Sequence, residues 1–286
     1  MADVFSNFSN QIRIAYEPST HLCIDECLYP FRGHCSFIQY MPQKPAKYGL
    51  KFWVMSDCET NIIVNILPYS GKEGGVVQRG LAQRVVMQLC APYANQWRNI
   101  TFDNYYTSVA LAEELWKNKF TMLGTLKLNS KGVPNNAKQS TDRTIHSSKF
   151  YFSGKQTVVS YSPKQKKVVL VLSTQHHDKA IDATDAKQAK KPCMITCYNS
   201  TKGTVDRNDQ SISHYSVRRR TNRWTMRTFH FMIDVAALNS YHLFLQVHPE
   251  EYLKQKLGSQ KNQWRRGFSG EACKTTNELR DEQAPC

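Results

Sequence analysis

Two aspartates stand directly after predicted strands, where side chains could act on a shared substrate. Asp57 follows the predicted strand of residues 48–56, and Asp103 follows that of residues 99–102. The carboxyl ends of neighbouring strands in an open α/β sheet meet at one crevice. We therefore expect Asp57 and Asp103 to lie close together, although 46 residues separate them.

A second pair of acids lies late in the chain. Asp206 and Asp209 are three residues apart at the start of a predicted helix, so they share one face. Converging carboxylates are the hard oxygen ligands that Mg²⁺ or Mn²⁺ prefers. A simpler interpretation is also open, because aspartate favours turns after strands and the first turn of a helix.

The elements that must position these acids alternate between strand and helix. Period-two patterns predict strands and 3.6-residue patterns predict helices. The predicted strands are residues 48–56, 60–67, 99–102 and 121–127, and the predicted helices are residues 78–90 and 107–119. This order predicts an α/β fold with a mixed sheet and flanking helices.

The pattern changes after Leu128. Three further strands are predicted at residues 149–152, 157–161 and 167–173, separated by turn sequences. They predict an all-β insertion, and the chain becomes helical again after residue 202. The core face expected for the last helix consists of Phe229, Ile233, Ala236, Ala237 and Leu243.

The charge balance points to a polyanionic partner. The 286 residues carry 38 Lys and Arg against 23 Asp and Glu, a net charge of +15. The densest cationic stretch comprises Arg218, Arg219, Arg220 and Arg223, followed by Trp224. Arginines with an aromatic ring suit DNA phosphates and base stacking, although a solvated helix face and a core tryptophan would look the same. No apolar run is long enough for a membrane span.

A series of motifs in a fixed order resembles the catalytic domain of piggyBac-type transposases. The motifs are HLCIDE (21–26), FRG (31–33), YMPQKPAKYGLK (40–51), FDNYYTS (102–108), GTLKLN (124–129), YNSTKGTVDRNDQ (198–210) and RTNRW (220–224). The resemblance spans residues 15–245.

The resemblance implies an RNase H-like core and a triad of aspartates. Motif by motif, the triad falls on Asp57, Asp103 and Asp206, with Asp209 as an additional carboxylate. These acids would hold two divalent ions, Mg²⁺ or Mn²⁺, for strand cleavage, hairpin formation and joining at TTAA targets.

The resemblance also assigns DNA contacts. It places Lys127 and Lys131 near target DNA and Trp224 close to the catalytic centre. Lys127 stands where the family more often has arginine, which would weaken bidentate phosphate contacts.

The expected organisation has five parts. A remnant of an N-terminal dimerisation and DNA-binding region covers residues 1–47, and the RNase H-like core covers 48–127 and 201–246. The β-rich insertion covers 128–200, and a basic polar tail covers 247–286. Cys273 and Cys286 are too few ligands for the zinc domain of the family, so we expect no zinc and a truncated transposase.

Two functions are therefore in view. The first is a metal-dependent transposase core whose partners are transposon ends and TTAA target DNA. The alternative is a domesticated DNA-binding protein without transposition. DNA as partner predicts a nuclear location, a homodimer is compatible with the family, and no membrane partner is expected.

Overall fold

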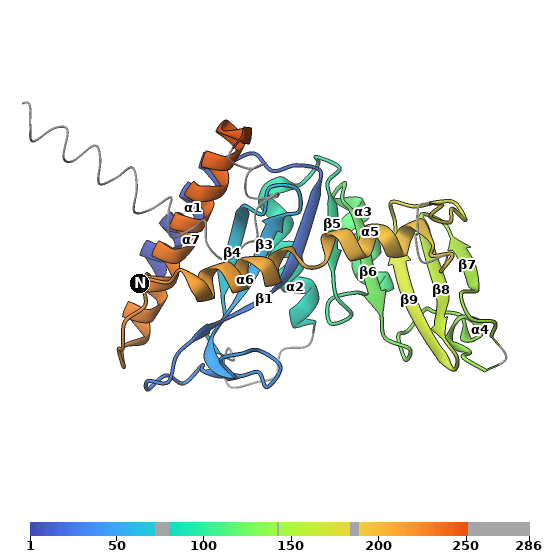
Figure 1. Cartoon of the computed structure of the whole chain (residues 1–286), viewed down its shortest axis with the longest axis horizontal. Coiled ribbons are helices and arrows are strands. Elements are labelled where there is room, and N and C mark those ends of the chain that lie inside the picture. Colours follow the sequence, from blue (N-terminus) through green and yellow to red (C-terminus); the bar gives the residue numbers. More distant parts are fainter. Residues whose placement is uncertain (72–79, 142, 184–188, 251–286) are drawn as a thin grey trace, which may run out of the picture. The chain divides into compact units, whose positions relative to one another are not determined.

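The computed structural model describes residues 1–71, 80–141, 143–183 and 189–250, which fall into two compact units, Met1–Asn239 and a second that begins at Ser240. Figure 1 shows the helices and strands. In chain order they are α1 (Ala2–Ala15), β1 (His21–Pro30), β2 (Gln39–Tyr40), β3 (Tyr48–Asp57), β4 (Ile63–Pro68), α2 (Leu81–Cys90), the 3₁₀ helix η2 (Ala91–Tyr93), β5 (Asn99–Phe102), α3 (Val109–Lys117), β6 (Thr121–Leu126), α4 (Asn135–Lys138), β7 (Ser148–Ser153), β8 (Gln156–Lys164), β9 (Lys167–Ser173), α5 (Cys193–Thr201), α6 (Thr204–His214) and α7 (Trp224–Val247).

One mixed sheet organises the first unit. Its strand order is β2-β3-β1-β5-β6-β9-β8-β7, and β4 pairs with β3 beside β2. Strand β1 is antiparallel to β3 on one side and parallel to β5 on the other, and β5 is parallel to β6. The mixed sheet with flanking helices confirms the predicted fold class.

Strand β1 is the main element that the sequence patterns did not predict. Its burial does not alternate, because residues 22–24 and 27–29 are all buried while Asp25 and Glu26 between them are partly exposed. A strand whose two faces are both covered has continuous apolar runs instead of alternation. The two central acids then interrupt even that signal.

The three insertion strands continue the same sheet. Strands β7, β8 and β9 are antiparallel, and β9 pairs with β6 from Leu123↔Ser173 to Leu126↔Leu170. One hydrophobic cluster joins Leu123 of β6, Val159 of β8 and Tyr198 of α5. The predicted β-rich insertion therefore shares its sheet and its core with the strands before it.

Helix α6 packs along β1 and β3, as Figure 1 shows. The amide of Asn208 fixes its position, since Nδ2 donates to Ser56 Oγ at 3.1 Å and to Asn61 O at 2.9 Å. Asn208 is only 2% exposed. This buried amide sets which face of α6 looks toward β1.

Helix α7 packs with a different face from the expected one. Phe231 is fully buried and stacks on Phe52 of β3, with ring centroids 4.0 Å apart. Phe229 and Ile233 are 43% and 37% exposed, so the predicted core face was wrong. The face of α7 that carries Asp234 points inward, because the buried carboxylate of Asp234 accepts hydrogen bonds from Tyr29 Oη and the backbone N–H of Val217.

None of the described helices is long and apolar enough to cross a bilayer.

Substitution of Gly124 tests how closely β6 packs against β5 and the segment that follows β5. A Cβ at this position would lie 2.2 Å from Thr107 Oγ1 and 2.9 Å from Phe102 O. Gly124→Ala should lower the free energy of unfolding by about 1–3 kcal/mol, since the neighbours must shift. Urea denaturation measures this, and Gly203→Ala is the control, because its Cβ meets only the end of Arg207 at 3.4 Å. Equal effects of the two substitutions would contradict the packing described.

Candidate active site

Asp57 and Asp103 do not share a crevice, so that prediction was wrong. Asp57 is opposite Leu22 in the antiparallel pairing of β3 with β1. Asp103 follows Phe102 at the carboxyl end of β5, and β5 runs parallel to β1. Because β3 runs the other way, its carboxyl end lies at the opposite edge of the sheet from that of β5.

Asp57 is buried in a network of hydrogen bonds. Its side chain is 0% exposed. It accepts hydrogen bonds from Tyr16 Oη at 2.9 Å, from the N–H and hydroxyl of Ser19 at 2.6 and 2.9 Å, and from the N–H groups of Glu59 and Thr60 at 2.8 and 3.2 Å. A carboxylate with five donors joins the segment before β1 to the turn after β3, and it has little capacity left for a metal ion.

Asp25 stands where Asp57 was expected. In the parallel pairing, Cys23 of β1 is opposite Thr101 of β5. Asp25 and Asp103 lie two residues further along their chains in the same direction, so they reach the same edge of the sheet. The hydrogen bonds to their carboxylates come from neighbouring backbone N–H groups, that of Glu26 to Asp25 and those of Tyr105 and Tyr106 to Asp103.

Helix α6 adds Asp206 and Asp209 to this edge. Lys44, in the connection between β2 and β3, lies between them, with Nζ 3.1 Å from Asp206 Oδ1 and 3.2 Å from Asp209 Oδ2. Asp209 also accepts a hydrogen bond from the buried thiol of Cys27 in β1. The ammonium thus pairs with Asp206 and Asp209 and lies close enough to Asp25 for their charges to interact, while the strand pairing places Asp103 beside Asp25. We call Asp25, Asp103, Asp206 and Asp209 the acidic cluster.

Burial and like charge act on the acidic cluster. Burial, followed by the charge of Glu26, raises the pKa of Asp25 from 3.8 to about 8. Burial also raises the pKa values of Asp103 and Asp209, which Lys127 and Lys44 respectively lower in part. Acids that resist ionisation in a shared site are typical of functional positions.

The donor set suits a hard divalent cation in its chemistry, because all four ligands are carboxylates with unused lone pairs. Among the residues that the structure describes, however, no three His, Cys, Asp or Glu side chains are arranged as a metal site. The Lys44 ammonium stands between two of the acids instead.

The predicted DNA-binding residues lie at exposed or half-buried positions. Lys127, directly after β6, is exposed, and its Nζ lies 5.9 Å from the centre of the Tyr105 ring. Lys131 is exposed in the loop that follows. Arg219, Arg220 and Arg223 are exposed, and Arg218 is half-buried.

Trp224 is half-buried at the start of α7 and packs edge-on against Phe37, with ring centroids 5.2 Å apart. The backbone before it is anchored, since Arg227 donates to Arg219 O at 3.1 Å. Its ring therefore has a structural partner in addition to a partly open face.

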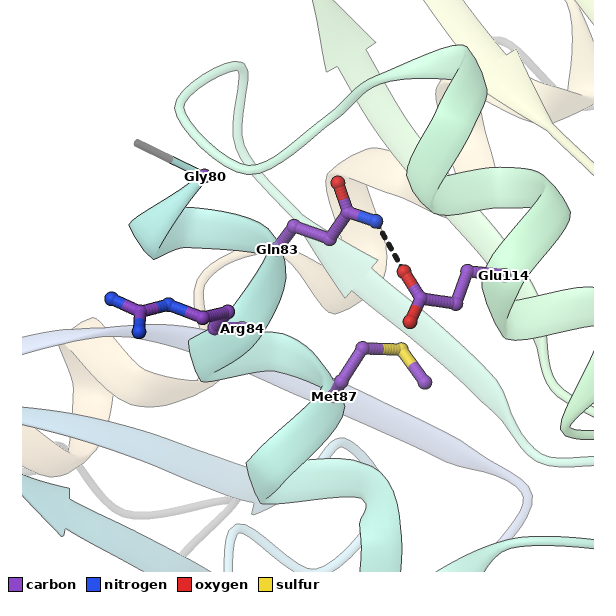
Figure 2. A pocket seen from close by; sticks show the side chains of 5 residues that line it. All are labelled: Gly80, Gln83, Arg84, Met87 and Glu114. Atoms are coloured by element: carbon purple, nitrogen blue, oxygen red, sulfur yellow. Dashed lines mark hydrogen bonds between the residues drawn. The ribbon is translucent and has the colours of Figure 1, made fainter. Parts of the chain in front are cut away.

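The surface pocket in Figure 2 lies apart from the acidic cluster. Its volume is 340 Å³, and it lies between α2 and α3, lined by Gly80, Gln83, Arg84, Met87 and Glu114. The amide of Gln83 donates to Glu114 across it. A single acid that is already hydrogen-bonded offers no catalytic set, so we assign no chemistry to this pocket.

The strand order and the acidic cluster together define an RNase H-like core. The chain belongs to the family described as Transposase IS4, whose profile matches residues 2–241. A solved structure with the same fold is the cryo-EM structure of the piggyBac transposase synaptic complex with hairpin DNA. It is 38% identical with a TM-score of 0.79, over 86% of this chain and 51% of that chain.

Two human proteins are also similar to this chain. PiggyBac transposable element-derived protein 3 and the chimeric ERCC6-PGBD3 protein are each 26% identical over 240 residues. These matches cover 78% of this chain and 40% and 22% of the two human proteins. The chain therefore spans less than half the length of these curated relatives.

Asp25 and Lys44 are the site residues that the sequence patterns missed. Asp25 could have been found from the HLCIDE motif, if residues 21–30 had been recognised as a strand. Lys44 lies in a Pro-Gln-Lys-Pro turn with no pattern of its own. Only the tertiary structure shows that its side chain reaches α6.

Asp57 and Asp103 should respond oppositely to removal of their charge. Asp57→Asn turns one acceptor oxygen, which faces two or three of the five donors, into a donor amide. The free energy of unfolding should therefore fall by about 1–3 kcal/mol or more. Asp103→Asn should leave it unchanged or raise it, because burial opposes the charge of Asp103. Urea denaturation of both variants without metal checks this, and a stable Asp57→Asn protein would refute the structural role.

The pKa of Asp25 predicts a pH dependence of stability. Between pH 3.8 and about 8 the unfolded chain has lost the proton that folded Asp25 retains. Raising the pH through this range therefore favours unfolding. Melting temperatures in EDTA should fall less steeply with pH for Asp25→Asn than for the wild type. Equal slopes of melting temperature against pH in the two proteins would contradict a raised pKa of Asp25.

Proposed function

We propose that the chain is the catalytic core of a DNA transposase, which cleaves and joins strands with divalent metal ions at TTAA targets. The catalytic acids of this proposal are Asp25, Asp103 and Asp206, with Asp209 as the additional ligand. Asp25 replaces Asp57 of the triad expected from the sequence. The observation that carries the proposal is the parallel pairing of β1 with β5, which places Asp25 and Asp103 at one edge of the sheet.

The four acids would act as metal ligands and would fix the positions of the bound ions. Two Mg²⁺ or Mn²⁺ ions, when bound, activate the attacking oxygen and stabilise the leaving oxygen of a phosphodiester. Asp25 and Asp103 are held by paired strands, and Asp206 and Asp209 by a helix that Asn208 fixes to β3. Rigid elements of this kind keep ligands in a productive geometry.

The basic residues would bind the DNA. Lys127 lies close enough to Asp103 to lower its pKa, so a phosphate bound there would be near the acidic cluster. A second cationic segment lies directly before α7 and comprises Arg218, Arg219, Arg220 and Arg223. Support for DNA as the partner comes from the similar piggyBac transposase, whose structure is a synaptic complex with hairpin DNA. Nuclear localisation and a homodimer stay predictions.

A domesticated DNA-binding protein is the second candidate. It is favoured by the similarity to a human protein that is named as derived from a transposable element. Such a protein would bind DNA through the same basic residues with a steep loss of affinity on added salt, but it would not cleave.

Strand nicking separates the two candidates. The purified chain is incubated with Mg²⁺ or Mn²⁺ and a duplex with TTAA-flanked ends. Asp25→Asn, Asp103→Asn and Asp206→Asn should each lose about 10²-fold or more of the nicking rate, because metal ions contribute several kcal/mol to such steps. Asp57→Asn is the matched control and should retain activity per folded molecule.

One outcome would refute the enzyme proposal, and another would refute the choice of catalytic acids. Salt-sensitive DNA binding without any metal-dependent nick would establish the binding protein instead. Full activity in Asp25→Asn, with none in folded Asp57→Asn, would restore the original triad.

A further inference from the structure

Lys44 lies half-buried among acids that belong to other parts of the fold. Its side chain is 17% exposed, and its ammonium pairs with both Asp206 and Asp209 of α6. The charge of Asp25 in β1 also acts on it. A single lysine therefore connects three of the four carboxylates of the acidic cluster.

The backbone around Lys44 is braced. The N–H of Lys44 donates to Met41 O at 3.1 Å, and the N–H of Lys47 donates to Lys44 O at 3.0 Å. The N–H of Met41 in turn donates to Lys47 O at 2.8 Å. This closed turn holds the backbone at Lys44 in place, and the two carboxylates of α6 hold the ammonium at the end of its side chain.

Neighbouring cations are engaged elsewhere. Arg207 is next to Asp206 in sequence, but its Nε and Nη2 donate to Asn61 Oδ1 at 3.1 and 3.0 Å. Lys127 lies against the Tyr105 ring. Within the described part of the chain, Lys44 is the one cation paired with Asp206 or Asp209.

We propose that Lys44 is a built-in counter-cation that occupies the acidic cluster without metal and competes with the divalent ions for Asp206 and Asp209. This inference rests on the proposed function, because it concerns the same four acids. Metal binding then requires the ammonium to withdraw from at least one of its two carboxylates.

The competition follows from distance and charge. Mg²⁺ binds a carboxylate oxygen at about 2.0–2.1 Å, and an ammonium within hydrogen-bond distance of the same oxygen repels the ion. Without either cation, however, four carboxylates would repel one another. Lys44 thus stabilises the metal-free fold at the expense of metal affinity.

Mn²⁺ binding without DNA tests the competition. Free Mn²⁺ is measured by electron paramagnetic resonance during titration of the wild type, Lys44→Met and Lys47→Met. Lys47 is exposed in the same turn and has no acidic partner among the described residues, which makes it the matched control. Lys44→Met should bind Mn²⁺ about tenfold more tightly and melt at a lower temperature in EDTA, and Lys47→Met should match the wild type.

The outcomes separate this inference from the proposed function. If none of the three proteins binds Mn²⁺, the metal site itself is refuted. If the wild type binds but Lys44→Met binds equally or more weakly, only the role of Lys44 is refuted.

A second measurement needs no variant, in case Lys44→Met does not fold. The wild type is treated with an amine-acetylating reagent with and without Mn²⁺, and modification is located by mass spectrometry. Acetylation of Lys44 should rise with Mn²⁺ relative to that of Lys47, because the released ammonium loses its carboxylate partners. An unchanged ratio at saturating Mn²⁺ would overturn the proposal.

Discussion

The pairing of β1 with its two neighbours is the constraint on which the rest of the site depends. Parallel pairing with β5 places Asp25 beside Asp103. Antiparallel pairing with β3 presents Ser56, to which Asn208 of α6 is hydrogen-bonded. A shift of β1 by one residue would turn Asp25 to the other face of the sheet. The strand register and the position of α6 are therefore parts of one arrangement.

The protein buries acidic side chains in two different ways. Asp57 accepts hydrogen bonds from Tyr16, Ser19 and the turn after β3, and these donors compensate its charge. Asp209 is compensated mainly by the charge of Lys44, and Asp25 is compensated first by the N–H of Glu26 and then by the charge of Lys44. The first arrangement stabilises a fold, whereas the second leaves lone pairs available for a ligand.

Periodicity and turn chemistry were sufficient to predict the α/β class, strands β3 to β6 and the strands of the insertion. They failed at β1, where residues 22–24 and 27–29 are buried on both faces around two acids. Without β1, Asp57 was the natural candidate because it follows a strand, and the direction of that strand within the sheet was not available. The faces of α7 were misassigned because burial of Asp234 depends on Tyr29 and residue 217, both distant in sequence.

Natural selection would retain Asp57 for folding and the acids of the acidic cluster for strand cleavage. In a gene copy that no longer needs strand cleavage, loss of Asp25 or Asp103 would remove a repulsion and cost the fold little. Loss of Asp57 would leave five donors facing no acceptor. Inactive copies of a transposase gene would therefore keep Asp57 long after the acids of the acidic cluster had been substituted. An aspartate conserved at position 57 across such copies would reflect a requirement of folding and not of strand cleavage.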